Sequence, residues 1–258
     1  MHASVPSLNT AVLGDHESGR LCFSYDKWNE MVSAVKPAMA FTLYDPLPLY
    51  GLPSKRRNAA VGRSHKWSQM ADSSPNRVTC KWIKPVCVSS DNTVYVFAED
   101  LCQNETLQQY ASRLKEIASK YRVMATAPSV AGLLTCLKAG VSFIECTLPW
   151  VLAEKGIALT LNTYPILGES PSRYTTQMDL NDYCFAVDIQ PLNPGCDCHT
   201  CKRHTRAYIH HLLTVQEMNA HILLTIHNLK SLVHVVRLYR RSSKDERDAL
   251  IDWLFRQL

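Results

Sequence analysis

The sequence predicts an α/β fold that suits part of a (β/α)8 barrel, followed by a helical C-terminal subdomain. Apolar, strand-like runs alternate with amphipathic helical segments between residues 93 and 144, as in parallel strands joined by crossover helices. Helical patterns dominate after residue 205. Hydrophobic residues make up 46% of the chain and charged residues 20%, which allows a sizeable core.

The N-terminal part is expected to begin with an irregular arm over residues 1–20. Ser24 is a candidate N-cap for a helix with apolar residues at helical spacing, which Pro37 ends. The apolar run 39–44 predicts a buried strand, and the prolines of 45–53 predict a loop. The basic run that follows is either a solvated helix face or a phosphate contact: Lys55, Arg56, Arg57, Arg63, His65 and Lys66.

The central part carries the repeating pattern. It predicts, in order, a strand over 93–98, a helix from Asn104 or Thr106, a strand over 121–126, a helix over 130–139 and a strand over 141–144. Gly140 is placed to end the second helix. Functional residues of (β/α)8 barrels lie at the C-terminal ends of the strands. Glu145 and Cys146 therefore occupy a place where a catalytic residue could lie.

The C-terminal part has a different pattern. It predicts a hairpin strand over 156–163, a polar loop over 165–182, a turn at Asn193–Gly195 and helices over 205–220, about 225–239 and 244–257. The expected organisation is an arm at 1–20, a partial barrel at 21–190, and a metal-binding subdomain with C-terminal helices at 191–258.

Charge and composition limit the class of protein. The net charge of +5 permits an anionic partner such as nucleic acid without requiring one. The first residues do not resemble a signal peptide. The long apolar segment 220–239 carries five Lys, Arg or His side chains, so no transmembrane helix is expected, and peripheral membrane attachment stays open. Seven single cysteines are expected to be buried, reduced thiols: Cys22, Cys80, Cys87, Cys102, Cys136, Cys146 and Cys184.

Three further cysteines lie within six residues: Cys196, Cys198 and Cys201. In a reducing compartment, thiols this close favour a metal over a disulfide or a reactive cluster. A structural Zn²⁺ takes four Cys or His ligands in a tetrahedron. We choose His227 as the fourth, because it lies 26 residues after Cys201 and a helical hairpin could return it to the loop. A closed four-ligand site favours one structural Zn²⁺ per chain over a catalytic one. The other histidines of the region are His199, His204, His210, His211, His221 and His234.

These residues resemble the zinc subdomain of the tRNA-guanine transglycosylase family. The Cys-x-Cys-x-x-Cys spacing, Arg206-Ala207-Tyr208 and His227-Asn228-Leu229 are in register with it. The family binds Zn²⁺ through three cysteines and a histidine in this pattern, at the positions filled here by Cys196, Cys198, Cys201 and His227. The resemblance also implies a (β/α)8 barrel that is incomplete at its N-terminus, as in a shortened form, since the family's first strands have no counterpart here.

Residues 139–149 resemble the strand that carries the family's nucleophile. Catalytic members have an aspartate followed by cysteine and, shortly after, Pro-Thr-Arg. Glu145 stands at the position of that aspartate, and Trp150 and Val151 stand where Thr-Arg would be. Neither the family's Asp-Ser-Gly-Gly-Phe-Gln motif nor its Gly-Gly-Leu-Ala-Val-Gly motif occurs in residues 1–258. A nucleophile must be held close to its target carbon, so the resemblance implies no catalytic residue in this chain.

Within the family, residues 201–213 are most similar to the accessory subunit of the eukaryotic queuine tRNA-ribosyltransferase heterodimer. This implies a non-catalytic subunit that binds the catalytic subunit and tRNA, and supports exchange of guanine for queuine at the wobble position of tRNAs with GUN anticodons. It also implies a cytoplasmic protein, with peripheral attachment to the mitochondrial outer membrane as an option. The alternatives are an active transglycosylase that uses Glu145 and a stand-alone zinc-containing RNA-binding module. A basic cluster is either a solvated face or a contact to RNA or a partner: Arg237, Arg240, Arg241 and Lys244.

Overall fold

The computed structural model describes residues 8, 10–16, 19–45, 53–89, 93–98, 105–163 and 175–258. Predictions for Cys102, for Asn104 and for the loop residues 46–52 and 165–174 lie outside the described residues. The chain divides into two compact units, one of Met1–Ala125 with Val141–Phe143 and one of Thr126–Gly140 with Ile144–Leu258. The domain boundaries expected near residues 20 and 190 stay a prediction.

The first unit begins with an antiparallel hairpin. β1 (Ala11–His16) pairs with β2 (Gly19–Ser24), in a segment where the sequence predicts an irregular arm. α1 (Tyr25–Val35) follows directly. Its N-cap is Ser24, whose hydroxyl accepts a hydrogen bond from the backbone N–H of Lys27. Capping by Ser satisfies a donor at the helix start, and this part of the prediction is confirmed.

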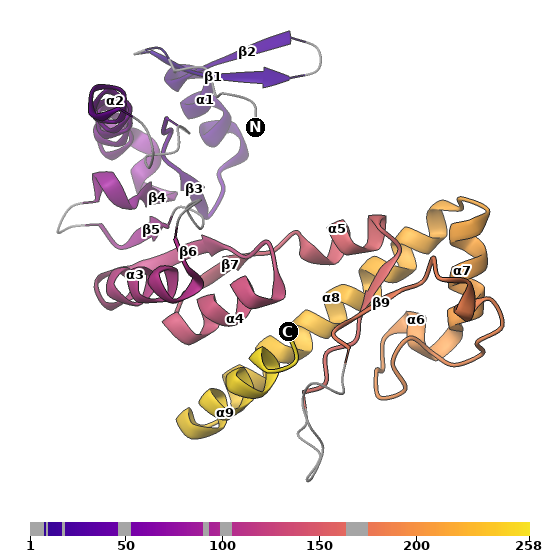
Figure 1. Ribbon diagram of the computed structural model, residues 1–258. Helices are drawn as coiled ribbons and strands as arrows, with labels where there is room; N and C mark the ends of the chain where they lie inside the picture. The colour runs from indigo at the N-terminus through magenta and orange to yellow at the C-terminus, as the bar shows by residue number, and fades with distance from the viewer. Residues whose placement is uncertain are drawn as a thin grey trace. The chain divides into compact units, whose positions relative to one another are not determined.

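A five-stranded sheet has the strand order β3-β4-β5-β6-β7 (Figure 1). Its strands are β3 (Met39–Phe41), β4 (Lys81–Pro85), β5 (Tyr95–Phe97), β6 (Arg122–Thr126) and β7 (Phe143–Glu145). The pairings from β3 to β6 are parallel. The α/β fold is confirmed, and its parallel sheet is consistent with an incomplete barrel. Within the described residues the sheet is open.

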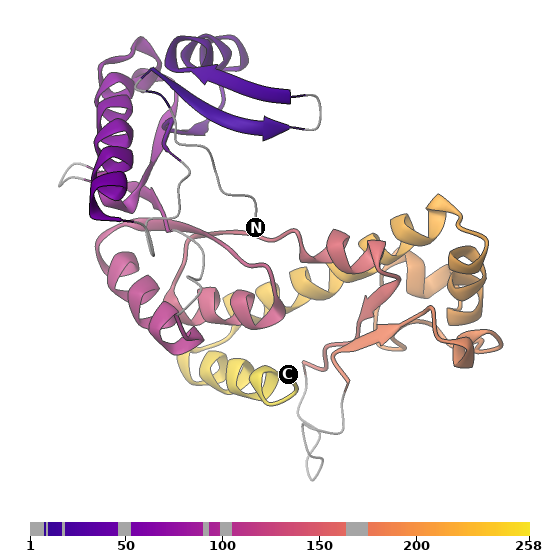
Figure 2. The same cartoon turned by 45° about the horizontal axis from the view of Figure 1, so that its top comes forward.

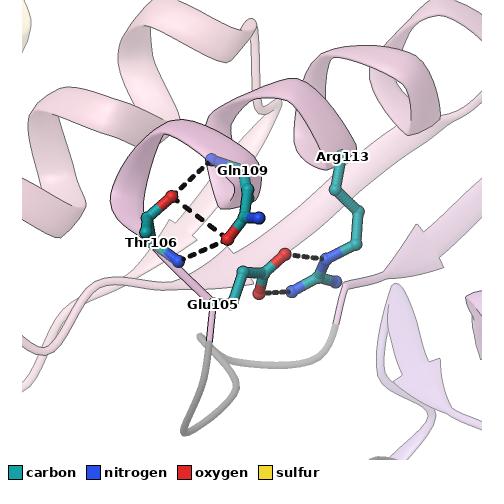
Figure 3. Close-up of polar contacts among 4 residues, drawn as sticks. All are labelled: Glu105, Thr106, Gln109 and Arg113. Carbon is teal, nitrogen blue, oxygen red and sulfur yellow. Dashed lines mark hydrogen bonds and ion pairs between the residues drawn. The ribbon is translucent and has the colours of Figure 1, made fainter.

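Two long helices connect strands in the first unit. They are α2 (Ser54–Ser73) and α3 (Leu107–Lys120), with short 3-10 turns at η1 (Pro75–Val78) and η2 (Val86–Val88). α3 starts with a capping box between Thr106 and Gln109, next to a bidentate pair of Arg113 with Glu105 at 2.8 Å (Figure 3). The box satisfies donors that a helix start leaves open, so the start predicted at Thr106 is confirmed.

The second unit begins with α4 (Val130–Ala139), α5 (Leu148–Glu154) and a hairpin of β8 (Ile157–Leu159) with β9 (Gln177–Asp179). α4 has the predicted bounds and ends at Gly140. β9 lies in a segment predicted to be loop. Gly156 adopts a φ of +75°, and the Asn181 amide fills the space that a Cβ would need there. Glycine therefore allows the tight connection from α5 into β8.

The C-terminal elements are η4 (Tyr183–Phe185), α6 (His199–Arg203), α7 (Arg206–Thr214), α8 (Met218–Arg241) and α9 (Lys244–Phe255). The single helix predicted over 205–220 is wrong, because the chain breaks at Gln216, whose φ is +57°. α8 accordingly begins well before residue 225. α5, α6 and α7 pack against this long helix (Figures 1 and 2), and β8 contacts it as well.

Two apolar clusters hold the second unit together. One joins α4, α5, β8, α8 and α9 through buried residues such as Leu134, Leu159 and Ile251. The other joins the hairpin to α7 and α8 through Leu180, Leu192, Ile209 and Leu224, with Cys201 packed against it. Burial of such side chains contributes roughly 1.5–3 kcal/mol each. The cysteine loop is therefore anchored on a packed core.

Candidate metal centre

Backbone hydrogen bonds shape the loop that carries the cysteines. Asn193 Oδ1 accepts from the backbone N–H of Gly195 at 3.0 Å, and the Asn193 carbonyl accepts from the N–H of Cys196 at 3.0 Å. Asparagine commonly makes a turn in this way, by bonding to the backbone two residues on. The turn predicted at Asn193–Gly195 is confirmed, and Cys196 leaves it as the first residue of the cluster.

Cys198 caps the short helix α6. Its Sγ lies 3.3 Å from the backbone nitrogen of Cys201, which donates to it. The thiolate is the form of cysteine that binds metals. Thr200 is fully buried, and its hydroxyl donates to the Leu223 carbonyl at 2.7 Å. This bond fixes α6 to α8.

His227 reaches the loop from α8, where its side chain is fully buried. Its Nδ1 lies 3.2 Å from Cys201 Sγ and 3.7 Å from Cys198 Sγ. Its Nε2 lies 2.8 Å from the Leu159 carbonyl oxygen. The hairpin of α7 and α8 thus returns this histidine to the cysteines, as the sequence spacing predicts.

The four predicted ligand groups converge on one point. The sulfur atoms of Cys196, Cys198 and Cys201 and a ring nitrogen of His227 all lie within 4.8 Å of one another. Tetrahedral Zn²⁺ with bonds of about 2.0–2.3 Å needs ligand atoms about 3.3–3.8 Å apart, so small adjustments would complete the tetrahedron. Thiolates with one imidazole are a donor set typical of Zn²⁺. The group can hold one metal ion.

Burial sets the protonation of the free ligands. It raises the pKa of the Cys196 and Cys201 thiols, and repulsion from neighbouring sulfurs adds to the shift. Burial also lowers the pKa of His227, against the opposing hydrogen bond to Leu159. The neutral imidazole is ready to coordinate, whereas thiols with a raised pKa release protons when a metal binds.

The other histidines of this region have different partners. Nδ1 of His210 and of His221 each lies against a backbone carbonyl, at 2.8 Å and 3.0 Å. His234 Nε2 lies 3.3 Å from the Thr163 hydroxyl. Among the residues that the structure describes, the four-residue group is the one set of three or more potential ligands close enough to share an ion.

Arg206 holds the segment that enters the loop. Its guanidinium donates to Asp188 Oδ2 at 2.9 Å, to the Pro191 carbonyl at 2.9 Å and to the Leu192 carbonyl at 3.4 Å. In the sequence, Arg206 stands out only as part of the triplet Arg206-Ala207-Tyr208, which is in register with the family. Tyr208 is 42% exposed and stacks on the His204 ring at 5.0 Å.

A profile described as Queuine tRNA-ribosyltransferase matches residues 97–250. The chain belongs to this family. A queuine tRNA-ribosyltransferase of Moorella thermoacetica is 34% identical over 143 residues, which cover 55% of this chain and 34% of the relative. The queuine tRNA-ribosyltransferase accessory subunit 2 of Schizosaccharomyces pombe is 37% identical over 98 residues, which cover 38% of this chain and 22% of the relative. The accessory subunit 2 of Anopheles gambiae is 32% identical over 108 residues, which cover 42% of this chain and 25% of the relative. The matched part spans about a third or less of each relative.

In this member of the queuine tRNA-ribosyltransferase family, β7 ends at Glu145. The Glu145 side chain is exposed, and its carbonyl accepts from the backbone N–H of Ala127 at 2.7 Å. Trp150 is 55% exposed on α5, and Val151 follows it. Glu145 therefore lies at the end of a strand, as predicted. That it does not act as a nucleophile stays a prediction.

Proposed function

We propose that this chain is a non-catalytic subunit of a queuine tRNA-ribosyltransferase and holds one structural Zn²⁺ on Cys196, Cys198, Cys201 and His227. In this role it binds the catalytic subunit, helps to position tRNA and contributes no chemical step. The reaction that it supports is exchange of guanine for queuine at the wobble position of tRNAs with GUN anticodons.

The segment from Glu145 to Val151 carries this proposal. Glutamate is one methylene longer than the aspartate nucleophile of catalytic relatives, and covalent catalysis depends on close alignment with the attacked carbon. Trp150 and Val151 replace a polar and a cationic side chain that such a site would use. Relatives named queuine tRNA-ribosyltransferase and relatives named accessory subunit 2 both match the chain, so the proposal depends on these local replacements rather than on overall identity.

Exposed apolar side chains on the second unit support a protein partner. Met218 and Ile222 on α8 are 72% and 46% exposed. Together with Ile226 and with Trp150 of α5, they line a hollow of about 670 Å³. Exposed apolar surface of this kind often marks an interaction site. We place the subunit contact on the zinc-binding region and its neighbouring helices, including the half-exposed Tyr208.

An active transglycosylase that uses Glu145 is the second candidate. The observation in its favour is the exposed carboxylate at the C-terminal end of β7, where barrel enzymes place catalytic groups. A stand-alone RNA-binding module is a third candidate. The net charge of +5 is modest for a protein that holds RNA without a partner.

Reconstitution tests the proposal. The full chain is co-expressed with a catalytic subunit, the two are purified through a tag on one of them, and incorporation of labelled guanine into tRNA is measured. We expect co-purification, exchange by the pair, and no exchange by this chain alone. Exchange by the isolated chain would support the active enzyme, and failure to co-purify would favour the stand-alone module.

No helix in the described part of the chain is long and apolar enough to span a membrane. The cytoplasmic location and the peripheral attachment to the mitochondrial outer membrane stay predictions, which fractionation of cells that express the tagged chain would test.

A further inference from the structure

The hydrogen bond between His227 and Leu159 determines which ring nitrogen is available to a metal. The Leu159 carbonyl can only accept, so Nε2, at 2.8 Å, carries the hydrogen. Nδ1 of the neutral ring then has the free lone pair, and it is Nδ1 that lies nearest the sulfur atoms of Cys198 and Cys201. The direction of the ring therefore depends on where β8 holds this one carbonyl.

Asn228 fixes the same peptide segment. Its Oδ1 accepts from the backbone N–H of Leu159 at 2.7 Å. Its Nδ2 donates to the Ile157 carbonyl at 2.9 Å and to the Pro149 carbonyl at 3.2 Å. The side chain is fully buried, and both ends of its amide are used. One side chain of α8 thus holds β8 and the first turn of α5 together.

We propose that Asn228 is a positioning residue for the metal centre. It holds the Leu159 residue from its N–H side, and the carbonyl of that same residue orients His227 so that Nδ1 is the metal ligand. The inference rests on the proposed zinc site. In other metalloproteins, replacing a group that orients a metal-bound histidine typically lowers the metal affinity by about 10–100-fold.

Burial makes this arrangement consequential. Asn228 and His227 are both fully buried, so a lost partner cannot be replaced by bulk water. Asn228 also contacts Pro149, four residues after Glu145. The Asn228 amide therefore helps to hold both the metal ligand on α8 and the segment that follows β7. Removing its hydrogen bonds should disturb the positions of both.

The test compares two amide-to-acid substitutions. Asn228→Asp keeps the size and the acceptor but loses both donors, and it faces two carbonyl oxygens. Gln257→Glu is the matched control. Gln257 is also buried and holds a peptide of the same segment, with Oε1 accepting from Asn162 N–H at 3.1 Å and Nε2 donating to the Asn162 carbonyl at 2.7 Å. It has no bond to Leu159 or His227 among those described.

Release of zinc from the purified full chain is followed with an excess of a coloured chelator. We expect Asn228→Asp to lose zinc at least about tenfold faster than wild type, and Gln257→Glu to release it near the wild-type rate. Equal rates for wild type and Asn228→Asp would overturn the inference while leaving the zinc site intact. A wild type without zinc would instead refute the proposed metal centre.

Two measurements on wild type keep the inference testable if Asn228→Asp does not fold. Long-range ¹H–¹⁵N spectra of the zinc-loaded protein should show His227 with a hydrogen on Nε2 and the metal on Nδ1. Hydrogen exchange at the Leu159 amide should be slow, because Asn228 and the strand shield it. Metal on Nε2, or rapid exchange at Leu159, would contradict the assignment.

Discussion

Arg206 Nη1 lies 2.9 Å from Asp188 Oδ2, and this pair joins the first turn of α7 to the segment that enters the metal loop. The same guanidinium also binds two backbone carbonyls. Lysine cannot reproduce a planar fork of donors. We expect Arg206→Lys to lower the midpoint of thermal unfolding and to speed zinc release. The control is Arg203→Lys, at an exposed residue of α6, which should do neither. Equal behaviour of the two variants would show that the fork is dispensable.

The same pair predicts a dependence on pH. A backbone bond from Gln190 and the Arg206 guanidinium hold the pKa of Asp188 below its usual 3.8. A lowered folded-state pKa adds stability above the unfolded value, and this stability is lost as the pH falls through the folded value. The stability that separates wild type from Asp188→Asn in urea should therefore be constant near neutral pH and shrink in acid. A difference that grows on acidification would contradict this sign.

The Thr200 hydroxyl is predicted to stabilise the packing of α6 on α8. Thr200→Val keeps the shape but removes the bond from the Thr200 hydroxyl to the Leu223 carbonyl, and the loss of one such bond should cost about 0.5–1.5 kcal/mol of unfolding free energy. Thr214→Val is the control, because the Thr214 hydroxyl bonds within its own exposed helix turn. Its effect should stay within about 0.5 kcal/mol. Chemical denaturation measures both, and similar losses would refute the argument.

Metal content tests the ligand assignment. Freshly purified wild type should contain about one Zn²⁺ per chain. Cys198→Ala should lose it and destabilise the C-terminal region, because metal binding contributes folding free energy. Cys184→Ala should keep its zinc, because this cysteine lies outside the cluster. Like Cys22 and Cys87 it is exposed, so the prediction that these three thiols are buried is wrong. Elemental analysis of the three proteins decides the matter, and zinc-free wild type would be incompatible with the assignment.

The partner surface can be tested with a charge. Ile222→Glu places a carboxylate among the exposed apolar side chains of the hollow on α8 and should weaken association with the catalytic subunit at least about tenfold, as loss of a well-packed contact does. Leu107→Glu, at a similarly exposed position on α3 (40% against 46%), should leave it unchanged. Titration by calorimetry measures both. Equal affinities would move the contact away from this hollow, as would unchanged binding after deletion of the residues that follow Pro194.

Local signals in the sequence predicted much of this fold. Ser24 and Thr106 cap helices where predicted, and Gly140 ends α4 in a left-handed conformation. Such caps are read from neighbouring residues alone. The group of potential metal ligands could also be predicted, since three cysteines within six residues, preceded by a turn, favour a metal site that a histidine can complete.

Elements that depend on tertiary contacts could not be predicted from the sequence. β4 carries Lys84 and ends in Pro85, so it lacks an alternating pattern, and its lysine is buried against Asp72. The chain breaks between α7 and α8 at Gln216, and no neighbouring glycine or proline predicts this break. The clamps made by Arg206 and Asn228 join segments far apart in the chain, and no local spacing predicts such bonds.

In the proposed accessory role this chain contributes no chemical step to guanine exchange. Incorporation of labelled guanine into tRNA is compared for the wild-type pair and for a pair that carries Glu145→Gln in this chain. Because the exposed Glu145 side chain has no assigned part in the reaction, the rates should be almost equal. Glu145→Asp in the isolated chain should likewise create no exchange, since one restored carboxylate supplies no means of recognising guanine. A loss of orders of magnitude in the Glu145→Gln pair would show that this carboxylate takes part in catalysis and would contradict the accessory role.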